Sequence, residues 1–178
     1  MIFAVVGPSG AGKDTLIAGA IEARRGLSPA LRLVRRVITR PTEAGGEDFE
    51  GVSPAEFDRR RARGDFALDW QAHGLHYGLP KDQLAGPGDV IFNGSRHALP
   101  RAMQLFDTLA VILVTAPVEV LAQRLAARGR EDAADIRARL DRAGFVLPPG
   151  IATRTVLNDA TPDVGIARML AALYPERG

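Results

Sequence analysis

The stretch GPSGAGK at residues 7–13 decides the fold of this chain. It has the spacing G-x-x-x-x-G-K, in which glycines let consecutive backbone N–H groups turn inward around an anion. The apolar run Ile2–Val6 before it has the composition of a β-strand, and Lys13–Ala23 after it carries apolar residues at helical spacing. A strand, a glycine loop and a helix in this order predict a phosphate-binding loop at a helix N-terminus, where the helix dipole favours negative charge.

The residue that follows the loop lysine departs from the strict pattern. A serine or threonine whose hydroxyl binds Mg²⁺ usually stands there, whereas this chain has Asp14, followed by Thr15. A carboxylate repels bare phosphate, but with Mg²⁺ between them it is a hard oxygen ligand. We therefore expect Lys13 on the terminal phosphates of a nucleoside triphosphate and Asp14 with Thr15 near Mg²⁺. The alternative is that Asp14 only favours the helix N-terminus as a first-turn acid.

Strand and helix patterns alternate along the rest of the chain. Further strands are predicted at residues 33–38, 66–70, 75–77, 90–92, 109–114 and 153–157. Helices are predicted from a capping box at residues 53–56, and at residues 99–106, 117–127, 133–145 and 162–173, while residues 41–51 have the pattern of a loop. Alternation of this kind predicts one α/β domain over residues 1–178, with a parallel sheet between helices.

Composition excludes several functional classes. The chain has 178 residues, and its 23 basic and 21 acidic side chains leave a net charge of +2, too small to indicate a nucleic-acid binder. No apolar run reaches 18 residues and no signal-peptide pattern is present, so neither a membrane span nor export is expected. The absence of cysteine excludes disulfides and thiolate chemistry, and it suits a reducing cytoplasm, which is the expected location.

Arginine accounts for 21 of the 23 basic residues, and two clusters of it stand out. One lies around the end of the second predicted strand and consists of Arg35, Arg36 and Arg40; the other is Arg128-Gly129-Arg130, between two predicted helices. The guanidinium group binds phosphate through two parallel hydrogen bonds. Small kinases need such groups to hold a phosphorylated acceptor and to close a basic lid over the transferred group. We interpret Arg124, further along the same region, as part of a solvated helix face.

The ends of the central strands also favour a kinase over a hydrolytic switch. Switch and motor ATPases usually have an acidic residue at the end of an apolar strand, which positions Mg²⁺ and water. The two central strands predicted here end at Asn93 and Thr115 instead.

Several motifs in order resemble the guanylate kinase branch of the nucleoside monophosphate kinases. They lie at residues 7–15, 38–41, 52–57, 64–70, 73–78, 93–96 and 128–130. The resemblance implies a guanylate kinase-like P-loop fold, with an acceptor-binding region at about residues 38–80 and an Arg-rich lid at about residues 128–140. It places ATP on Gly7, Pro8, Ser9, Gly10, Ala11, Gly12, Lys13, Asp14 and Thr15, with Asn158 near adenine.

The acceptor motifs depart from those of guanylate kinases. Thr42 stands where that family has a second arginine, Phe49 replaces a phosphate-binding tyrosine, and Leu79-Pro80 follows Tyr77-Gly78 where the family has polar residues. Asp69 could still serve guanine, but a pocket that loses its hydrogen-bonding partners also loses discrimination for the base. GMP is therefore poorly suited as the acceptor.

The same positions resemble a sister family more closely, the ribose 1,5-bisphosphate phosphokinases of phosphonate utilisation. Its motifs match residues 12–14, 38–40, 70–75, 77–78, 93–96, 99–100 and 128–131, and it also carries aspartate after the loop lysine. The resemblance implies that ATP phosphorylates ribose 1,5-bisphosphate to 5-phosphoribosyl 1-diphosphate. The partner would then be a phosphorylated sugar, with no nucleic acid or membrane involved. The sequence leaves open whether the chain acts as a monomer or as a homodimer.

On this interpretation Lys13, Arg128 and Arg130 act on the transferred group, and Arg40 binds an acceptor phosphate. The acceptor pocket is further assigned Asp69, Tyr77, Asn93, Ser95 and Arg96. No general base is required, because a phosphate oxygen is already a nucleophile. Two alternatives stay open: a guanylate kinase, and a catalytically inactive guanylate kinase-like interaction module.

Overall fold

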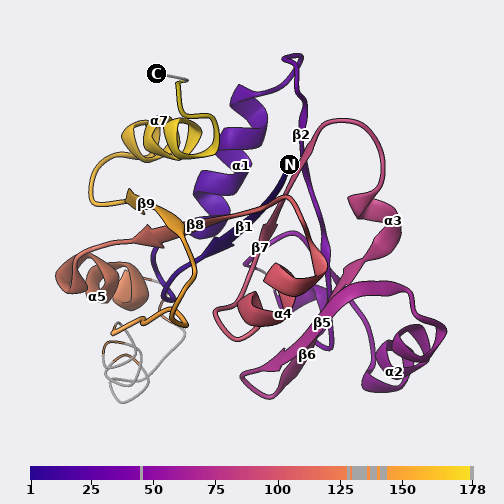
Figure 1. The fold of residues 1–178 in the computed structure, drawn as a ribbon. Helices are drawn as coiled ribbons and strands as arrows, with labels where there is room; N and C mark the ends of the chain where they lie inside the picture. The colour runs from indigo at the N-terminus through magenta and orange to yellow at the C-terminus, as the bar shows by residue number, and fades with distance from the viewer. Residues whose placement is uncertain (45, 128, 130–135, 137–139, 141–143, 177–178) are drawn as a thin grey trace.

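The structure is a computed structural model that describes residues 1–44, 46–127, 129, 136, 140 and 144–176 (Figure 1). Its main sheet is wholly parallel, with the strand order β2-β7-β1-β8-β9. These strands are β1 (Ile2–Val6), β2 (Leu31–Leu33), β7 (Asp89–Asn93), β8 (Leu109–Thr115) and β9 (Thr153–Leu157). Since β1 is the central strand, the loop that follows it lies between the carboxyl ends of β7 and β8. The α/β class predicted from the sequence is confirmed.

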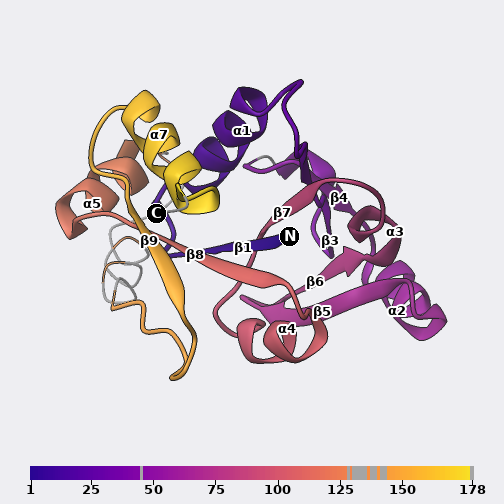
Figure 2. The ribbon, with the colours of Figure 1, turned by 45° about the horizontal axis from the view of Figure 1, so that its top comes forward.

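Helices cover the two faces of this sheet (Figure 2). Helices α1 (Lys13–Ala23) and α7 (Pro162–Leu173) pack side by side on one face, over a core that includes Phe3, Ile112 and Met169. Helix α4 (Leu99–Leu105) packs on the opposite face, together with part of a second sheet. Helix α5 (Val118–Ala127) follows β8. The apolar stripe of α1 explains its position, because Leu16, Ile17 and Ala20 are its buried residues.

A second, four-stranded sheet is built from residues between Arg36 and Pro80. Its strand order is β4-β3-β6-β5, with β3 (Arg36–Ile38), β4 (Phe49–Gly51), β5 (Phe66–Ala72) and β6 (Leu75–Pro80). Strands β5 and β6 form a hairpin whose turn, His73-Gly74, has positive φ at both residues, the conformation that a two-residue hairpin turn favours. The short helices η1 (Thr42–Ala44), α2 (Pro54–Arg63) and α3 (Lys81–Leu84) complete this part. The register of the hairpin places Trp70 opposite Tyr77.

Two sequence expectations are wrong in this region. The strand predicted at residues 33–38 is two strands in different sheets, because Val34 N–H donates to Ile91 O at 2.9 Å while Arg35 N–H turns away to Gln83 Oε1 at 2.6 Å. The loop predicted at residues 41–51 contains η1 and β4, and β4 pairs in parallel with β3. The helix predicted at residues 133–145 and the lid at residues 128–140 lie for the most part outside the described residues.

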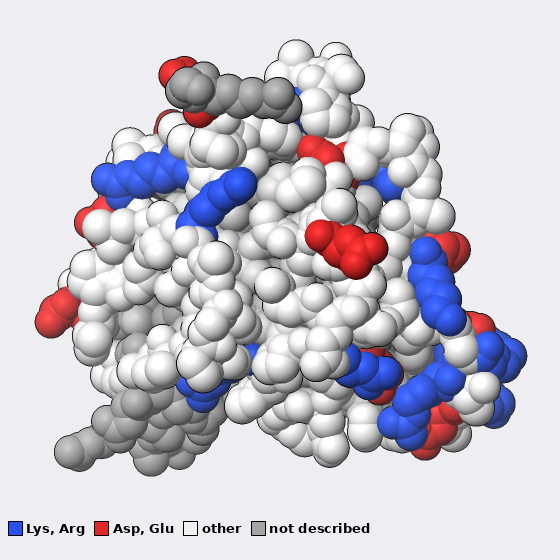
Figure 3. Space-filling view, viewed as in Figure 1, with Lys and Arg blue, Asp and Glu red and all other residues white. Residues whose placement is uncertain are grey.

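Helix α2 begins as its capping signal predicts, and its charges are internally paired. Ser53 Oγ accepts the N–H of Glu56 at 3.2 Å. The Glu56 carboxylate accepts from Arg59 and Arg60, and these bonds lower its pKa to about 2. Figure 3 shows positive and negative side chains interleaved over α2, in agreement with these ion pairs. The arginines of α2 therefore face their own acidic neighbours rather than a site.

None of the helices built from described residues has the length and apolar character needed to cross a bilayer.

The N-cap residues of α2 and α7 offer a matched test of the fold, because only the first of them makes a side-chain capping bond. Thr161 occupies the same N-cap position on α7 but makes no side-chain capping bond. We expect Ser53→Ala to lower the free energy of unfolding in urea by about 1 kcal/mol, because one N–H of α2 loses its acceptor. Thr161→Ala should have a much smaller effect. Equal losses from the two substitutions would show that the cap of α2 is not formed as described.

Candidate active site

The loop at residues 7–13 is shaped by glycines where a side chain would not fit. Gly10 and Gly12 adopt φ of +84° and +86°, a region that glycine enters without strain. Gly7 passes so close to β8 that a Cβ atom there would lie 2.1 Å from the carbonyl oxygen of Val114. The chain can therefore turn from β1 directly into α1, whose first N–H groups face the loop.

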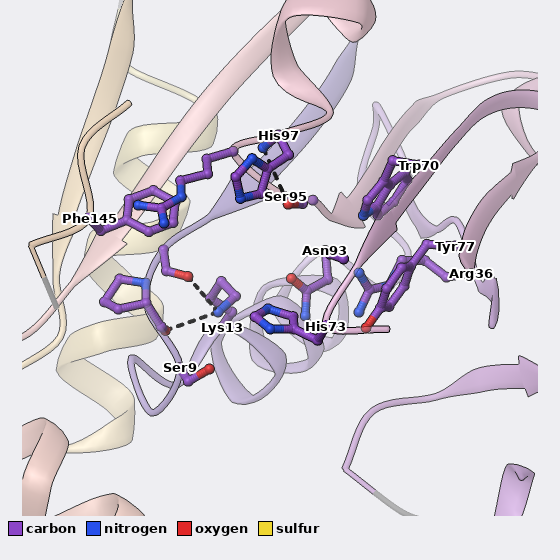
Figure 4. Close-up of a pocket in the computed structure, with 15 residues that line it drawn as sticks. Ser9, Lys13, Arg36, Trp70, His73, Tyr77, Asn93, Ser95, His97 and Phe145 are labelled. Atoms are coloured by element: carbon purple, nitrogen blue, oxygen red, sulfur yellow. Dashed lines mark hydrogen bonds between the residues drawn. The ribbon is translucent and has the colours of Figure 1, made fainter. Parts of the chain in front are cut away.

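Lys13 lies across the mouth of this loop. Its Nζ donates to the carbonyl oxygens of Gly7 at 3.0 Å and Pro8 at 3.1 Å (Figure 4). These bonds hold the ammonium group over the inward-turned backbone, where it adds positive charge to the helix terminus. The geometry suits an anion bound jointly by the loop and the lysine.

Residues from distant parts of the chain brace the loop from below. Asn158 is 5% exposed; its Nδ2 donates to Ala11 O at 2.7 Å, and its own N–H donates to Thr115 O at 2.8 Å. Arg124 Nη1 lies 3.4 Å from the carbonyl oxygens of Gly10 and Ala11. The structure thus places Asn158 beneath the loop, while its predicted contact with adenine stays a prediction. It contradicts the interpretation of Arg124 as part of a solvated helix face.

Asp14 is positioned by the end of a neighbouring strand. Asn93, the last residue of β7, donates from Nδ2 to Asp14 Oδ1 at 2.7 Å. Thr15 is exposed, and it is absent from the linings of the described cavities beside the loop. Within the described parts of the chain, no three His, Asp or Glu side chains converge to hold a metal by themselves. A single carboxylate next to a phosphate loop nevertheless suits Mg²⁺, which commonly shares its ligands with substrate phosphates.

A cavity of about 200 Å³ opens in front of the loop (Figure 4). The loop and Lys13 form one wall, the β5–β6 hairpin forms the opposite wall, and residues 93–97 after β7 line the space between them. Among the predicted site residues, the structure brings Lys13, Tyr77, Asn93, Ser95 and Arg96 together here. The cavity thus joins the two motif groups that the sequence predicts to be a nucleotide site and an acceptor site.

The hairpin wall combines a cation with two stacked rings. Trp70 and Tyr77 stack with centroids 5.4 Å apart and planes at 5°. The Arg36 guanidinium lies 5.0 Å from the Tyr77 ring, is 7% exposed, and donates from Nε to Glu47 Oε2 at 2.9 Å. Burial raises the pKa of the Tyr77 phenol, against an opposing effect of Arg36, so the phenol stays protonated at neutral pH. Arg36 was not among the predicted site residues.

Arg96 and its neighbours line the remaining side of the cavity. The Arg96 guanidinium lies over the ring of Phe145 at 5.0 Å, and Ser95 Oγ accepts the N–H of His97 at 3.3 Å. His73, at the hairpin turn, points into the cavity from the opposite wall (Figure 4).

Two of the predicted acceptor residues, Arg40 and Asp69, do not line this cavity. Arg40 lies over the ring of Phe49 at 4.2 Å and lines a separate surface depression with Thr39 and Thr42. Asp69 alternates with Trp70 along β5 and lies 3.6 Å from Arg101. Arg128 and Arg130 lie outside the described residues.

Together, the phosphate loop at the centre of a parallel sheet and the hairpin wall that faces it define a P-loop kinase. The fold is similar to the crystal structure of a guanylate kinase from Anaplasma phagocytophilum, with a TM-score of 0.62 and 18% identity over 99% of this chain and 87% of that one. It is also similar to a sugar kinase from Janibacter sp., with a TM-score of 0.53 and 16% identity over 97% and 93% of the two chains. At these identities the likeness establishes the fold alone.

Sequence comparison defines the family. The chain is 48% identical to ribose 1,5-bisphosphate phosphokinase PhnN of Ruegeria sp. over 99% of its length and 93% of the relative, and 45% identical to that of Agrobacterium fabrum over 90% of each. The chain belongs to the ribose 1,5-bisphosphate phosphokinase family. It also matches a bifunctional ribose 1,5-bisphosphokinase-thymidine phosphorylase of Cupriavidus necator at 47% identity, but it spans only 28% of that longer protein. No protein-family model matches the chain.

The bond from Asn158 to the loop can be tested with two ligands. Asn158→Ala leaves the buried Ala11 carbonyl without its donor, so we expect the free energy of unfolding to fall by about 1–3 kcal/mol. Because the loop itself is loosened, the affinities for ADP and for inorganic pyrophosphate should fall by the same factor in calorimetric titrations. A loss confined to ADP would instead support the adenine contact predicted from the sequence.

Proposed function

We propose that this chain transfers the γ-phosphoryl group of ATP to the 1-phosphate of ribose 1,5-bisphosphate, giving ADP and 5-phospho-α-D-ribose 1-diphosphate. The observation that carries the proposal is the cavity in which an intact phosphate loop faces a wall of Arg36, Trp70 and Tyr77. The names of relatives that match nearly the full length of the chain support the identity of the acceptor. An ATP-dependent reaction is expected in the cytoplasm, where ATP is supplied.

The reaction needs positioning and charge neutralisation more than proton transfer. An oxygen of the acceptor phosphate attacks the γ-phosphorus of ATP, and the bond from that phosphorus to the oxygen bridging it to the β-phosphorus breaks, with ADP leaving. The loop N–H groups and Lys13 would hold the phosphates of ATP in line with the acceptor. Asp14 would hold Mg²⁺, which when bound neutralises part of the phosphate charge. Arg128 and Arg130 are proposed to close over the transferred group.

The acceptor is proposed to lie between the loop and the hairpin. Arg96 offers a guanidinium for an acceptor phosphate, and Tyr77 offers a phenolic donor for a phosphate or a sugar hydroxyl. The flat faces of the aromatic pair suit the C–H groups of a sugar ring. Arg40 and Asp69 lie away from this cavity in the structure described. They keep the acceptor roles predicted for them only if the second sheet and its loops move when the acceptor binds.

A guanylate kinase is the closest alternative, since the fold is similar to one. The substituted acceptor positions weigh against it. Phe49 is buried beneath Arg40, and Leu79 is fully buried, so neither position presents a polar group to a base. An inactive interaction module is also disfavoured, because the loop keeps its glycine conformations and the Lys13 bonds.

The acceptor is tested by supplying ATP with ribose 1,5-bisphosphate or with GMP and following the products by phosphorus NMR. We expect kcat/KM for the sugar bisphosphate to exceed that for GMP by about a hundredfold or more, because the guanine-binding groups are missing. The growth of diphosphate resonances other than those of ADP identifies the expected product. Faster turnover of GMP would restore the guanylate kinase alternative.

The two candidate phosphate-binding arginines can be compared directly. Arg96→Ala should raise the KM for the acceptor about tenfold or more and change that for ATP little, because it removes a charged donor from the acceptor side only. Arg40→Ala is the matched substitution outside the cavity. A larger effect on the acceptor KM from Arg40→Ala than from Arg96→Ala would place the acceptor phosphate in the other depression.

A further inference from the structure

Asp14 and Asn93 exchange the positions that a neutral polar residue and a carboxylate commonly occupy around a phosphate loop. In the common arrangement a hydroxyl residue follows the loop lysine, and an aspartate elsewhere at the site accompanies it near Mg²⁺. Here the carboxylate follows the lysine, and an amide ends the neighbouring strand β7. The site keeps one carboxylate and one neutral polar group, but their positions are exchanged.

The structure shows that the two exchanged groups contact each other. Strand β7 pairs in parallel with β1, with Asn93 level with Val5, just before the loop. From there Asn93 Nδ2 donates to Asp14 Oδ1 at 2.7 Å. Asn93 lines both the main cavity and a smaller cavity that Asp14 also lines, so its side chain is shared by the two cavities. An amide N–H can only donate, so the bond fixes which oxygen of Asp14 is engaged and leaves Oδ2 for another ligand.

Electrostatics explains why the exchange must involve both residues. Among the described residues that line the main cavity there is no carboxylate, whereas Asp14 lines the smaller cavity beside it, together with Glu47 and Asp48. A second carboxylate at position 93 would lie within hydrogen-bonding distance of Asp14 and repel it. An amide avoids this repulsion and orients the charged group.

We infer that Asn93 is a positioning residue that holds the Asp14 carboxylate as the protein ligand for the Mg²⁺ that accompanies the nucleotide. The inference rests on the proposed function, because it requires the loop to bind nucleotide. It also decides between the two roles open to Asp14, since an acid that only favours the helix terminus needs no partner from β7.

The test is a calorimetric titration of ADP into the full chain, once in EDTA and once in Mg²⁺. The quantity of interest is the factor by which Mg²⁺ tightens ADP binding. For Asn93→Ala we expect an unchanged affinity in EDTA and a loss of about tenfold or more in the Mg²⁺ effect, as for other residues that orient a metal ligand. Asp14→Ser should lower the Mg²⁺ effect by about tenfold or more, because a neutral hydroxyl replaces a charged ligand, and it should bind ADP at least as tightly in EDTA, because a negative charge beside the phosphates is removed.

The double variant Asp14→Ser with Asn93→Asp rebuilds the common arrangement. It should regain about tenfold or more of the Mg²⁺ effect lost in Asp14→Ser, a recovery that a structural role for either residue does not predict. Asp163→Ser is the matched control, because Asp163 is the first-turn acid of α7. It should leave ADP binding unchanged in both buffers.

Two results would overturn the inference: equal weakening of ADP binding by Asn93→Ala in EDTA and in Mg²⁺, or a double variant no better than Asp14→Ser. A wild-type chain that binds ADP without any Mg²⁺ effect contradicts the inference and leaves nucleotide binding intact. A wild-type chain that binds no ADP in either buffer contradicts the proposed function itself, and the inference with it.

Discussion

The close passage of Gly7 past β8 is the constraint on which the site depends. A Cβ atom at Gly7 would lie 2.1 Å from Val114 O, and one at Gly12 would lie 2.5 Å from the side-chain nitrogen of Asn158. Only a backbone without side chains can therefore turn within this space. The turn places the first N–H groups of α1 around one point and brings Lys13 over it. Both the anion site and the position of Asp14 follow from this turn.

The order of the strands then determines what surrounds the loop. Because β1 is central, the ends of β7 and β8 flank the loop, and β9 beyond β8 brings Asn158 beneath it. Residues that follow β7 line the cavity floor, and the inserted sheet supplies the facing wall with Arg36 and its aromatic neighbours. Two sheets thus meet at one cavity, with the phosphate loop on one side and the β5–β6 hairpin on the other.

Local sequence patterns predicted the helices and strands whose bounds depend on neighbouring residues in the chain. The bounds of β1, α1 and β9 agree with the predicted ranges, and β5 and β6 contain the strands predicted at residues 66–70 and 75–77. The break between β2 and β3 was missed, because residues 33–38 have the pattern of one strand and only the hydrogen-bond partners Ile91 and Gln83 separate its two halves. Strand β4 was missed because its acidic, Gly-rich surroundings resemble a loop.

The site residues also divide into those that local sequence patterns predict and those that depend on distant contacts. The loop motif predicted Lys13, and the motif after β7 predicted Asn93, Ser95 and Arg96. The contacts of Asn158 and Arg124 with the loop span more than a hundred residues, and no local pattern reports them. The burial of Arg36 against Glu47 could not be predicted either, because charged residues are buried only when a partner is present, and sequence spacing alone does not show which acid that is.

The central claim is that the backbone of residues 7–15 holds the phosphate chain of the nucleotide. Amide NMR spectra of the labelled protein, recorded while ADP is added, test it most directly, because each N–H group reports its own contact. The account predicts that the largest shifts fall on the amides of Gly10, Gly12 and Lys13, and that inorganic pyrophosphate reproduces them. Shifts concentrated around Arg40 and Thr42, with the loop amides unchanged, would contradict it.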